Sequence, residues 1–231
     1  MASVNSPLPA GEEKARRVRG MFDAIAGRYD LVNRVMTFGL DVGWRRAAVR
    51  ELRLPGRARV ADLACGTGDL CTELGRAGYR PVGFDFSLGM LSRATTDAPL
   101  ACADVLRLPL RDGAVEGVTC GFALRNVVSL DALFAEIARV VRRGGRIALL
   151  EAARPANRVA RAGHAVYFDR IVPLIGGALS DAEAYRYLPR SMAYLPEPDG
   201  LLAMLRGAGF DDARRRTFGA GAAQLLTGTR S

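Results

Sequence analysis

The sequence predicts a doubly wound α/β fold around a mostly parallel sheet. Short apolar segments of strand length alternate with helical patterns from Arg59 onward, which is the order of repeated βαβ units. The first of these strands leads directly into a glycine-rich turn and a helix. With 231 residues, 49% of them hydrophobic, the chain can bury the core of one such domain. We therefore expect a single domain over residues 1–231.

The N-terminal part comes before this alternation. Residues 1–15 include a stretch rich in proline and small residues, and we expect a flexible leader there. Residues 16–54 carry a helical pattern and are expected to form a helical cap. Pro55 and Gly56 then interrupt the chain.

The core of the domain is expected over residues 55–153. Its expected strands are residues 60–64, 81–84, 100–103, 115–122 and 146–151. Its expected helices run from the glycine turn to Ala77, begin at Ser87, and span residues 130–141. Helical connections between strands of one sheet imply parallel strands with right-handed crossovers.

Beyond the core the pattern changes. Residues 154–198 read as a largely helical insertion, which we expect to cover the substrate. Residues 199–231 form the C-terminal part, with a helix over 199–207 and strands over 213–218 and 222–227 that are joined through Gly219 and Gly221. A C-terminal hairpin should therefore close the sheet.

The net charge of +9 is compatible with an anionic partner. Nearly all of the positive charge is arginine, and Lys14 is the only lysine. Because no aromatic RNA-binding motif, zinc finger or dense basic run accompanies the charge, we expect no nucleic-acid partner.

The cysteines and the hydropathy indicate the compartment. Cys65, Cys71, Cys102 and Cys120 lie in apolar stretches without metal-ligand spacing, as buried thiols in a reducing compartment do. No cluster of histidine, cysteine and carboxylates predicts a metal site. No segment approaches the roughly 20 apolar residues of a membrane span, and residues 1–11 lack the apolar core of a signal peptide. We expect a cytoplasmic protein.

The strongest chemical signal is the segment 62–69, which leaves the first strand, turns on Gly66 and Gly68, and enters a helix. The glycines let the backbone approach a ligand closely, and a ligand is expected at this switch point of the sheet. Asp85 ends the second strand 19 positions after Gly66, where its carboxylate can accept both hydroxyls of a ribose. The pattern indicates nucleoside recognition.

The same region favours S-adenosylmethionine over a nicotinamide dinucleotide. Cys71 stands where a dinucleotide site prefers a third glycine, and no basic cradle for a pyrophosphate is nearby. Asp62 can contact the ammonium of adenosylmethionine directly or through water, and Thr67 offers a hydroxyl beside it. Asp104 ends the third strand and is spaced to bind the adenine amino group, with the N–H of Val105 at the ring. A turn cap is the alternative role for Asp104.

Four further segments resemble one family. They are 29–39 (Tyr-Asp-Leu-Val-Asn-Arg-Val-Met-Thr-Phe-Gly, with Trp44 after four further residues), 121–126 (Gly-Phe-Ala-Leu-Arg-Asn), 139–151 (Arg-Val-Val-Arg-Arg-Gly-Gly-Arg-Ile-Ala-Leu-Leu-Glu) and 185–188 (Tyr-Arg-Tyr-Leu). On these segments the chain resembles the ubiquinone/menaquinone biosynthesis C-methyltransferases from about residue 18 to its end. It departs from their pattern at Arg143, usually proline, and at Ala153, commonly serine.

The resemblance implies a Rossmann-like class I S-adenosylmethionine-dependent methyltransferase fold, with a seven-stranded sheet. It implies transfer of a methyl group to a ring carbon of a prenylated quinol, preferably demethylmenaquinol. It further implies cofactor contacts from Thr67, Asp85, Asp104, Val105 and Gly121.

Candidate catalytic residues follow from position. Arg125 and Asn126 come just after the fourth strand and are expected to orient the substrate hydroxyl or stabilise a phenolate, whereas a capped turn is the alternative. His164, the sole histidine, is a candidate base, with a partly buried helix residue as the alternative. Tyr29 is expected to close over the cofactor, and packing against Trp44 is the alternative.

The segment 156–179 reads as amphipathic and is broken at Pro173 and Gly176. Its arginines are Arg158, Arg161 and Arg170. Because a prenylated quinol resides in the membrane, we expect weak, salt-sensitive contact of this segment with anionic lipid, with plain packing as the alternative.

Two other function classes stay open. One is a methyltransferase of secondary metabolism that acts on a small aromatic substrate. The other is a non-catalytic RNA- or membrane-binding module, against which the intact set of Asp62, Gly66, Gly68 and Asp85 argues. The quinone, its prenyl length, the general base and a homodimer are also left open by the sequence.

Overall fold

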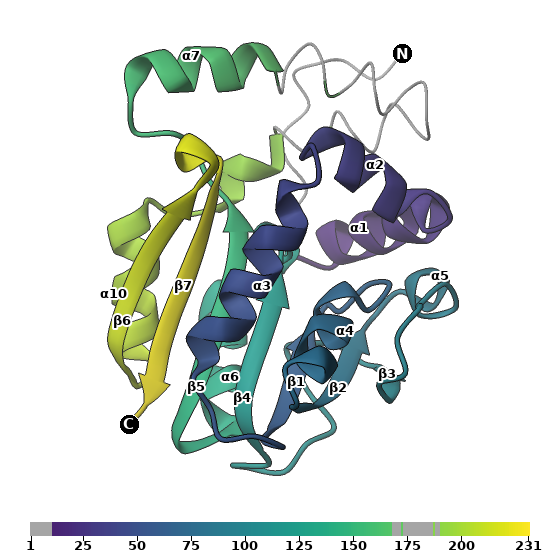
Figure 1. The fold of residues 1–231 in the computed structure, drawn as a ribbon, viewed down its shortest axis with the longest axis vertical. Coiled ribbons are helices and arrows are strands. Elements are labelled where there is room, and N and C mark those ends of the chain that lie inside the picture. The colour runs from purple at the N-terminus through teal and green to yellow at the C-terminus, as the bar shows by residue number, and fades with distance from the viewer. Residues whose placement is uncertain (1–10, 168–171, 173–186, 188–189) are drawn as a thin grey trace.

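A seven-stranded sheet forms the centre of the protein in our computed structural model, which describes residues 11–167, 172, 187 and 190–231 (Figure 1). The strands are β1 (Arg59–Leu63), β2 (Arg80–Asp85), β3 (Leu100–Cys102), β4 (Val115–Gly121), β5 (Val141–Ala152), β6 (Phe210–Phe218) and β7 (Ala223–Arg230). Their order in the sheet is β3-β2-β1-β4-β5-β7-β6. All neighbours are parallel except β7, which is antiparallel to both β5 and β6. The predicted doubly wound sheet and its closing hairpin are confirmed.

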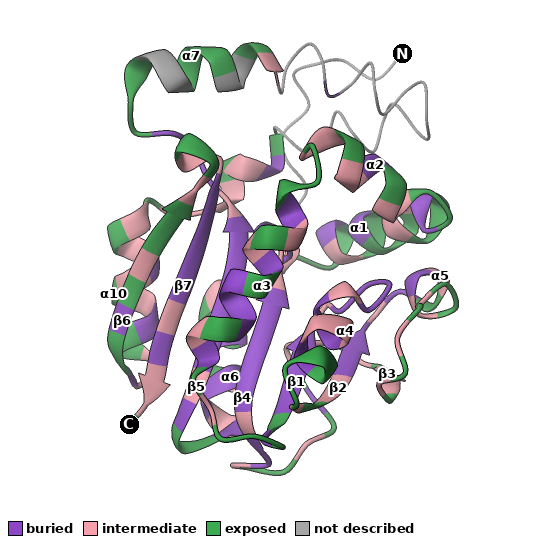
Figure 2. Ribbon diagram, in the orientation of Figure 1, coloured by how far each residue is buried: buried purple, intermediate pink, exposed green. Residues whose placement is uncertain are grey.

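Helices cover both faces of the sheet. They are α1 (Gly11–Ile25), α2 (Tyr29–Met36), α3 (Leu40–Leu52), α4 (Asp69–Arg76), α5 (Leu88–Leu91), α6 (Leu130–Val140), α7 (Arg158–Val166) and α10 (Pro198–Gly207). On one face, α3 and α4 pack through residues such as Leu52 and Leu74. On the other, α6 and α10 pack through Phe134 and Leu205. Figure 2 shows the buried strands between these layers.

Local sequence sets where these elements begin. Ser129 starts α6, because its side chain accepts a hydrogen bond from the N–H of Ala132 at 3.2 Å. Ser87 caps α5 in the same way through the N–H of Met90. Between β1 and α4 the chain turns at Gly68, which has a φ of +88°, and a Cβ there would lie 2.5 Å from Thr96 Cγ2. Only glycine satisfies both conditions.

The N-terminal helix is longer than predicted. Residues 11–15, which the sequence assigns to a flexible leader, are the first part of α1. The reason is a tertiary contact, since the buried Lys14 donates a hydrogen bond to the carbonyl of Val127 at 2.7 Å. Residues 1–10 lie outside the described residues, as does most of the predicted insertion beyond α7.

Two strands also start earlier than predicted. β5 begins at Val141 rather than at Arg146, and β6 begins at Phe210 rather than at Ala213. The first residues of both strands pair irregularly. The register of β5 against β4 shifts between Val115 and Gly117, and the register of β6 against β7 shifts between Asp211 and Arg214. Such irregularity interrupts the alternation on which strand prediction relies. In the described part of the chain, no helix has the length and apolar character needed to cross a bilayer.

Candidate active site

The carboxyl ends of β1, β2, β3 and β4 meet at one edge of the sheet, where α1 and α2 lie over them (Figure 1). A cavity of about 100 Å³, here called the inner cavity, opens at this edge. It is lined by several of the residues predicted to bind the cofactor, namely Tyr29, Gly66, Asp85, Asp104, Val105 and Gly121. Parallel strands thus bring together side chains that are far apart in the sequence.

Asp85 is the best-anchored polar group of the inner cavity. Its Oδ2 accepts the N–H of Gly66 and its Oδ1 accepts the N–H of Ser87, both at 2.8 Å. Burial raises the pKa of Asp85, while these N–H groups oppose the shift. The carboxylate therefore has a fixed orientation and joins the glycine turn after β1 to the loop after β2.

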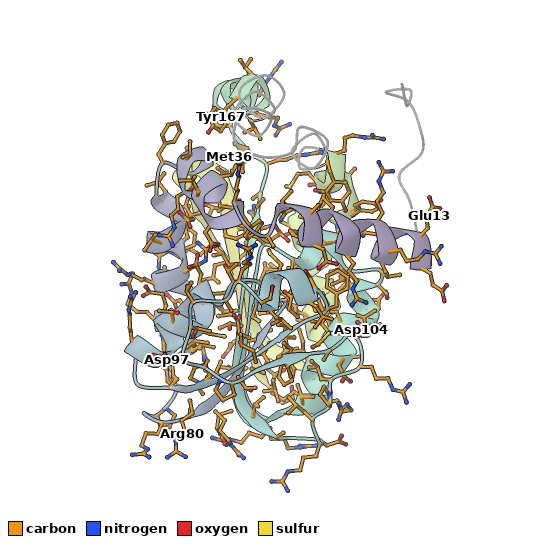
Figure 3. The ribbon with its side chains drawn as sticks, turned by 90° about the vertical axis from the view of Figure 1, so that its right-hand side faces the viewer. Glu13, Met36, Arg80, Asp97, Asp104 and Tyr167 are labelled. Atoms are coloured by element: carbon orange, nitrogen blue, oxygen red, sulfur yellow. The ribbon has the colours of Figure 1, made fainter. Side chains whose placement is uncertain are left out.

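Asp104 caps the turn after β3 and also lies in the wall of the inner cavity. Its Oδ1 accepts the N–H of Leu106 at 2.9 Å, so the turn cap is present. The residue also lines the inner cavity beside Val105. In Figure 3 Asp104 lies below α1, whose residues Ala15 and Val18 line the same cavity.

Three other predicted residues lie behind the cavity wall. Asp62 and Thr67 are buried, and neither they nor Gly68 line a cavity at this edge of the sheet. Asp62 accepts hydrogen bonds from the Thr119 hydroxyl at 2.7 Å and the Cys71 thiol at 3.5 Å. The Thr67 hydroxyl donates to Asp30 at 2.7 Å. Direct ligand contact by Asp62 or the Thr67 hydroxyl would require them to leave these bonds.

A second cavity of about 260 Å³, here called the outer cavity, lies between the N-terminal helices and the ends of β4 and β5. Its lining is largely apolar, from residues such as Met21, Ile25, Met36, Phe38 and Trp44. The two cavities share a wall, because Phe22, Tyr29, Phe122 and Asn126 line both. Two ligands bound here would be neighbours.

Tyr29 belongs to this shared wall. Its ring meets that of Phe22 edge-on, with the centroids 5.8 Å apart. Trp44, the alternative partner considered from the sequence, is instead paired with Phe122 at 6.4 Å. Burial raises the pKa of the Tyr29 hydroxyl, which stays protonated.

Arg125 is held rigidly where the sequence predicts it, just after β4. Its guanidinium pairs with Glu151 and donates to the carbonyl of Phe122 at 2.9 Å. The backbone N–H groups of Arg125 and Ala152 also donate to the Glu151 carboxylate, at 3.1 and 2.7 Å. Both members of the ion pair are buried. Removing either partner would leave a buried charge unpaired, so the pair fixes Arg125 at the outer cavity.

Sequence reasoning missed two charged groups near the outer cavity. One is Glu151, whose signal was a carboxylate directly after the apolar run of residues 147–150. The other is the buried pair of Asp41 and Arg45, both of which line the cavity. Its signal was the spacing of four residues on one helix.

Two further expectations concern a histidine base and a metal site. His164 lies in α7, but its side chain is outside the described structure, so its role as a base stays a prediction. Within residues 11–167, 172, 187 and 190–231, no three histidine, cysteine or carboxylate residues are grouped to hold a metal ion.

Comparison with known proteins places this geometry in a family. The model of the ubiE/COQ5 methyltransferase family matches residues 10–230. The chain belongs to this family. A demethylmenaquinone methyltransferase of Roseiflexus castenholzii is 45% identical, with 96% of each chain covered. One of Deinococcus radiodurans is 41% identical, covering 95% of this chain and 96% of the relative.

Solved structures agree on the fold. A methyltransferase of Thermotoga maritima, described as a possible histamine N-methyltransferase, has a TM-score of 0.67 and 17% identity, and covers 93% of this chain and 100% of its own. The [4+2]-cyclase SpnF has a TM-score of 0.65 at 18% identity, with coverage of 97% and 99%. The ubiE/COQ5 family member described here therefore has the class I fold of S-adenosylmethionine-dependent methyltransferases.

S-adenosylmethionine is the cofactor of this methyltransferase, and the residues that line the inner cavity are of the kinds that such a cofactor needs. Asp85 supplies an oriented carboxylate, whereas Phe86 and Met90 supply apolar surface beside it. Gly121 also lines this cavity, and a Cβ there would lie 2.9 Å from Leu70, so packing against α4 requires a glycine at this position. Asn126 lines both cavities, and its Oδ1 is a buried acceptor without a partner among the described residues.

The buried Asp62 makes stability depend on pH. Burial raises its pKa from 3.8 to about 7, so its neutral form stabilises the fold and this contribution is lost as pH rises toward 7. The variant Asp62→Asn keeps an acceptor for Thr119 but does not ionise. We expect the wild-type free energy of unfolding to fall by about 2–3 kcal/mol more than that of the variant between pH 5 and 8. Denaturant titrations at both pH values measure the free energies of unfolding. An equal fall in the wild type and the variant would contradict the prediction.

Proposed function

We propose that this methyltransferase transfers the methyl group of S-adenosylmethionine to a ring carbon of a prenylated quinol, with demethylmenaquinol as its substrate. The observation that carries the proposal is the shared wall, which makes a large apolar cavity the neighbour of the cofactor cavity. An apolar cavity of this kind suits a prenylated ring better than a small polar metabolite. The names of the relatives, at up to 45% identity over nearly the whole chain, support the same substrate.

Each cofactor-binding residue has a role in this proposal. Asp85 accepts both ribose hydroxyls, Asp104 accepts from the adenine amino group, and the N–H of Val105 donates to the ring. Gly66 and Gly121 allow close approach, and Tyr29 covers the cofactor. Asp62, Thr67 and Gly68 hold the turn from behind. When bound, the cofactor supplies an electrophilic methyl group on a sulfonium.

The substrate side supplies orientation and charge. Asn126 lines both cavities, and its Oδ1 lacks another partner among the described residues, so it orients the hydroxyl next to the reacting carbon by accepting its hydrogen bond. When that proton passes to water, Arg125, fixed by Glu151 at the outer cavity, stabilises the phenolate that remains. Electron density from that phenolate activates the neighbouring ring carbon.

We also propose that the protein docks on an anionic membrane around the mouth of the outer cavity. Leu31, Val35, Phe38, Leu40 and Val166 are exposed apolar residues, and Phe38 is 78% exposed. Phe38 and Leu40 also line the outer cavity. Tyr167 links α7 to this region by donating to the carbonyl of Met36 at 2.7 Å (Figure 3). Arg158 and Arg161 on α7 are exposed nearby, while Arg170 is outside the described residues.

Among the predictions of the proposed function, the first concerns the product. Incubation of the protein with labelled cofactor and demethylmenaquinol should yield menaquinol with the new methyl on carbon, as read by mass spectrometry and NMR. A phenol without the prenyl chain should react much more slowly, because it leaves the apolar cavity unfilled. A methoxy product, or preference for the simple phenol, would overturn the proposed function.

The second prediction concerns Asp85. Replacement by alanine removes charge-assisted hydrogen bonds to ribose and should weaken cofactor binding roughly tenfold or more. Calorimetry with S-adenosylmethionine measures the change. Asp97→Ala is the matched control, since Asp97 is exposed and lines neither cavity. Unchanged affinity in a folded Asp85→Ala variant would remove this residue from the site.

The third prediction concerns the membrane. The protein should cosediment with anionic vesicles at low salt and release them at high salt. Phe38→Ser should reduce binding roughly tenfold through lost apolar burial, and Arg158/Arg161/Arg170→Gln should reduce it through lost charge. Leu88→Ser is the control, because Leu88 is 59% exposed on α5. No vesicle binding by the wild type, or equal binding by all variants, would disprove the docking surface.

A further inference from the structure

Two residues in the wall of the outer cavity each carry a buried side-chain atom without a hydrogen-bond partner among the described residues. In the described part of the chain, the buried side-chain atoms without a hydrogen-bond partner are Asn126 Oδ1, Arg146 Nε and the hydroxyl of Tyr187. Asn126 and Tyr187 line the outer cavity, whereas Arg146 lines neither cavity. Buried polar groups in native proteins almost always have partners, so unpaired groups on residues of a cavity wall are candidates for contact with a ligand.

Tyr187 differs from the other tyrosines of this cavity. The Tyr167 hydroxyl donates to the carbonyl of Met36 at 2.7 Å, and the Tyr29 hydroxyl is not among the buried atoms without a partner. Tyr187 is the one whose hydroxyl is left to a ligand. Burial raises its pKa to about 12, so it stays a donor at neutral pH.

The two unpaired atoms lie at different places relative to the cofactor. Asn126 lines both cavities, whereas Tyr187 lines only the outer one. A ligand oxygen at Asn126 is therefore next to the reacting methyl group, and an oxygen at Tyr187 is farther from it. A 1,4-quinol carries two oxygens on opposite sides of one ring, which matches two separate unpaired groups. A simple phenol would satisfy only one of them.

We propose that the Tyr187 hydroxyl donates a hydrogen bond to the quinol oxygen farther from the reacting carbon. This inference rests on the proposed function and deepens it, because it makes the second ring oxygen a determinant of specificity. A site that is built to bind a substrate hydroxyl rejects an analogue that lacks it, since a buried protein group is then left unpaired. Tyr187 would thus distinguish a quinol from a phenol of the same size and prenyl chain.

The test compares two proteins on two substrates. The substrates are demethylmenaquinol with a short prenyl chain, kept reduced, and its analogue without the hydroxyl farther from the methylated carbon. The variant is Tyr187→Phe, which removes only the phenolic oxygen. We expect the wild type to lose roughly tenfold or more in kcat/KM on the analogue. The variant should be slower on the quinol by a similar factor and should show little further loss on the analogue.

Control measurements separate this role from a structural one. Tyr79→Phe is the matched control, because the Tyr79 hydroxyl donates to the carbonyl of Leu54 and lies outside both cavities. It should behave as the wild type on both substrates. Calorimetry should give unchanged cofactor affinity for Tyr187→Phe, since Tyr187 does not line the inner cavity.

Three other outcomes would contradict the contact with Tyr187 or the proposed function. If the ratio of kcat/KM on the quinol to kcat/KM on the analogue were the same in the wild type and in Tyr187→Phe, loss of the tyrosine hydroxyl and loss of the substrate hydroxyl would be independent. This result would disprove the contact and leave the proposed function standing. Loss of cofactor affinity in the variant would also disprove it, in favour of a structural role. No methyl transfer to the quinol by the wild type would overturn the proposed function and this inference with it.

Discussion

Buried polar groups at the carboxyl edge of the sheet have to find partners, and this requirement organises the rest of the molecule. Asp85 receives N–H groups from the loops after β1 and β2, and Asp62 receives the hydroxyl of Thr119 from β4. These bonds tie adjacent strand ends into one rigid floor. Apolar packing alone could not do this, because unpaired carboxylates in such a place would be strongly destabilising.

The N-terminal helices complete the same network from above. Lys14 donates to the carbonyl of Val127, Asp23 accepts the N–H of Gly89 at 3.0 Å, and Asp30 accepts the hydroxyl of Thr67. Arg34 reaches Asp69 at 3.2 Å. Each contact joins α1 or α2 to a loop or to the first turn of a helix at this edge of the sheet, so the helices over both cavities are held by polar bonds. The apolar faces of these helices are then free to line the cavities.

The sequence was most informative where one strand or turn determines the outcome. Asp85 and Asp104 lie at one cavity because parallel strands end at one edge, which periodicity and glycine turns predict, whereas Gly121 was indicated by the family resemblance. The sequence was less informative where contacts between distant segments determine the structure. The helical start of α1 depends on Lys14 meeting Val127, and the fixed position of Arg125 depends on Glu151, 26 residues away. Tyr187 was only part of a resembling segment, and its unpaired hydroxyl has no signature in local pattern.

Methyl transfer from a sulfonium needs little chemistry from the protein beyond alignment and charge at the acceptor. Reaction type therefore depends on the residues around the acceptor, and the sheet can be shared, as with the similarly folded [4+2]-cyclase SpnF. In the proposed function those residues come from the N-terminal helices, the turn that holds Arg125 and Asn126, and Tyr187. On this proposal the inner cavity fixes the donor, and the outer cavity, apolar except for a few oriented groups, selects the ring that receives the methyl group.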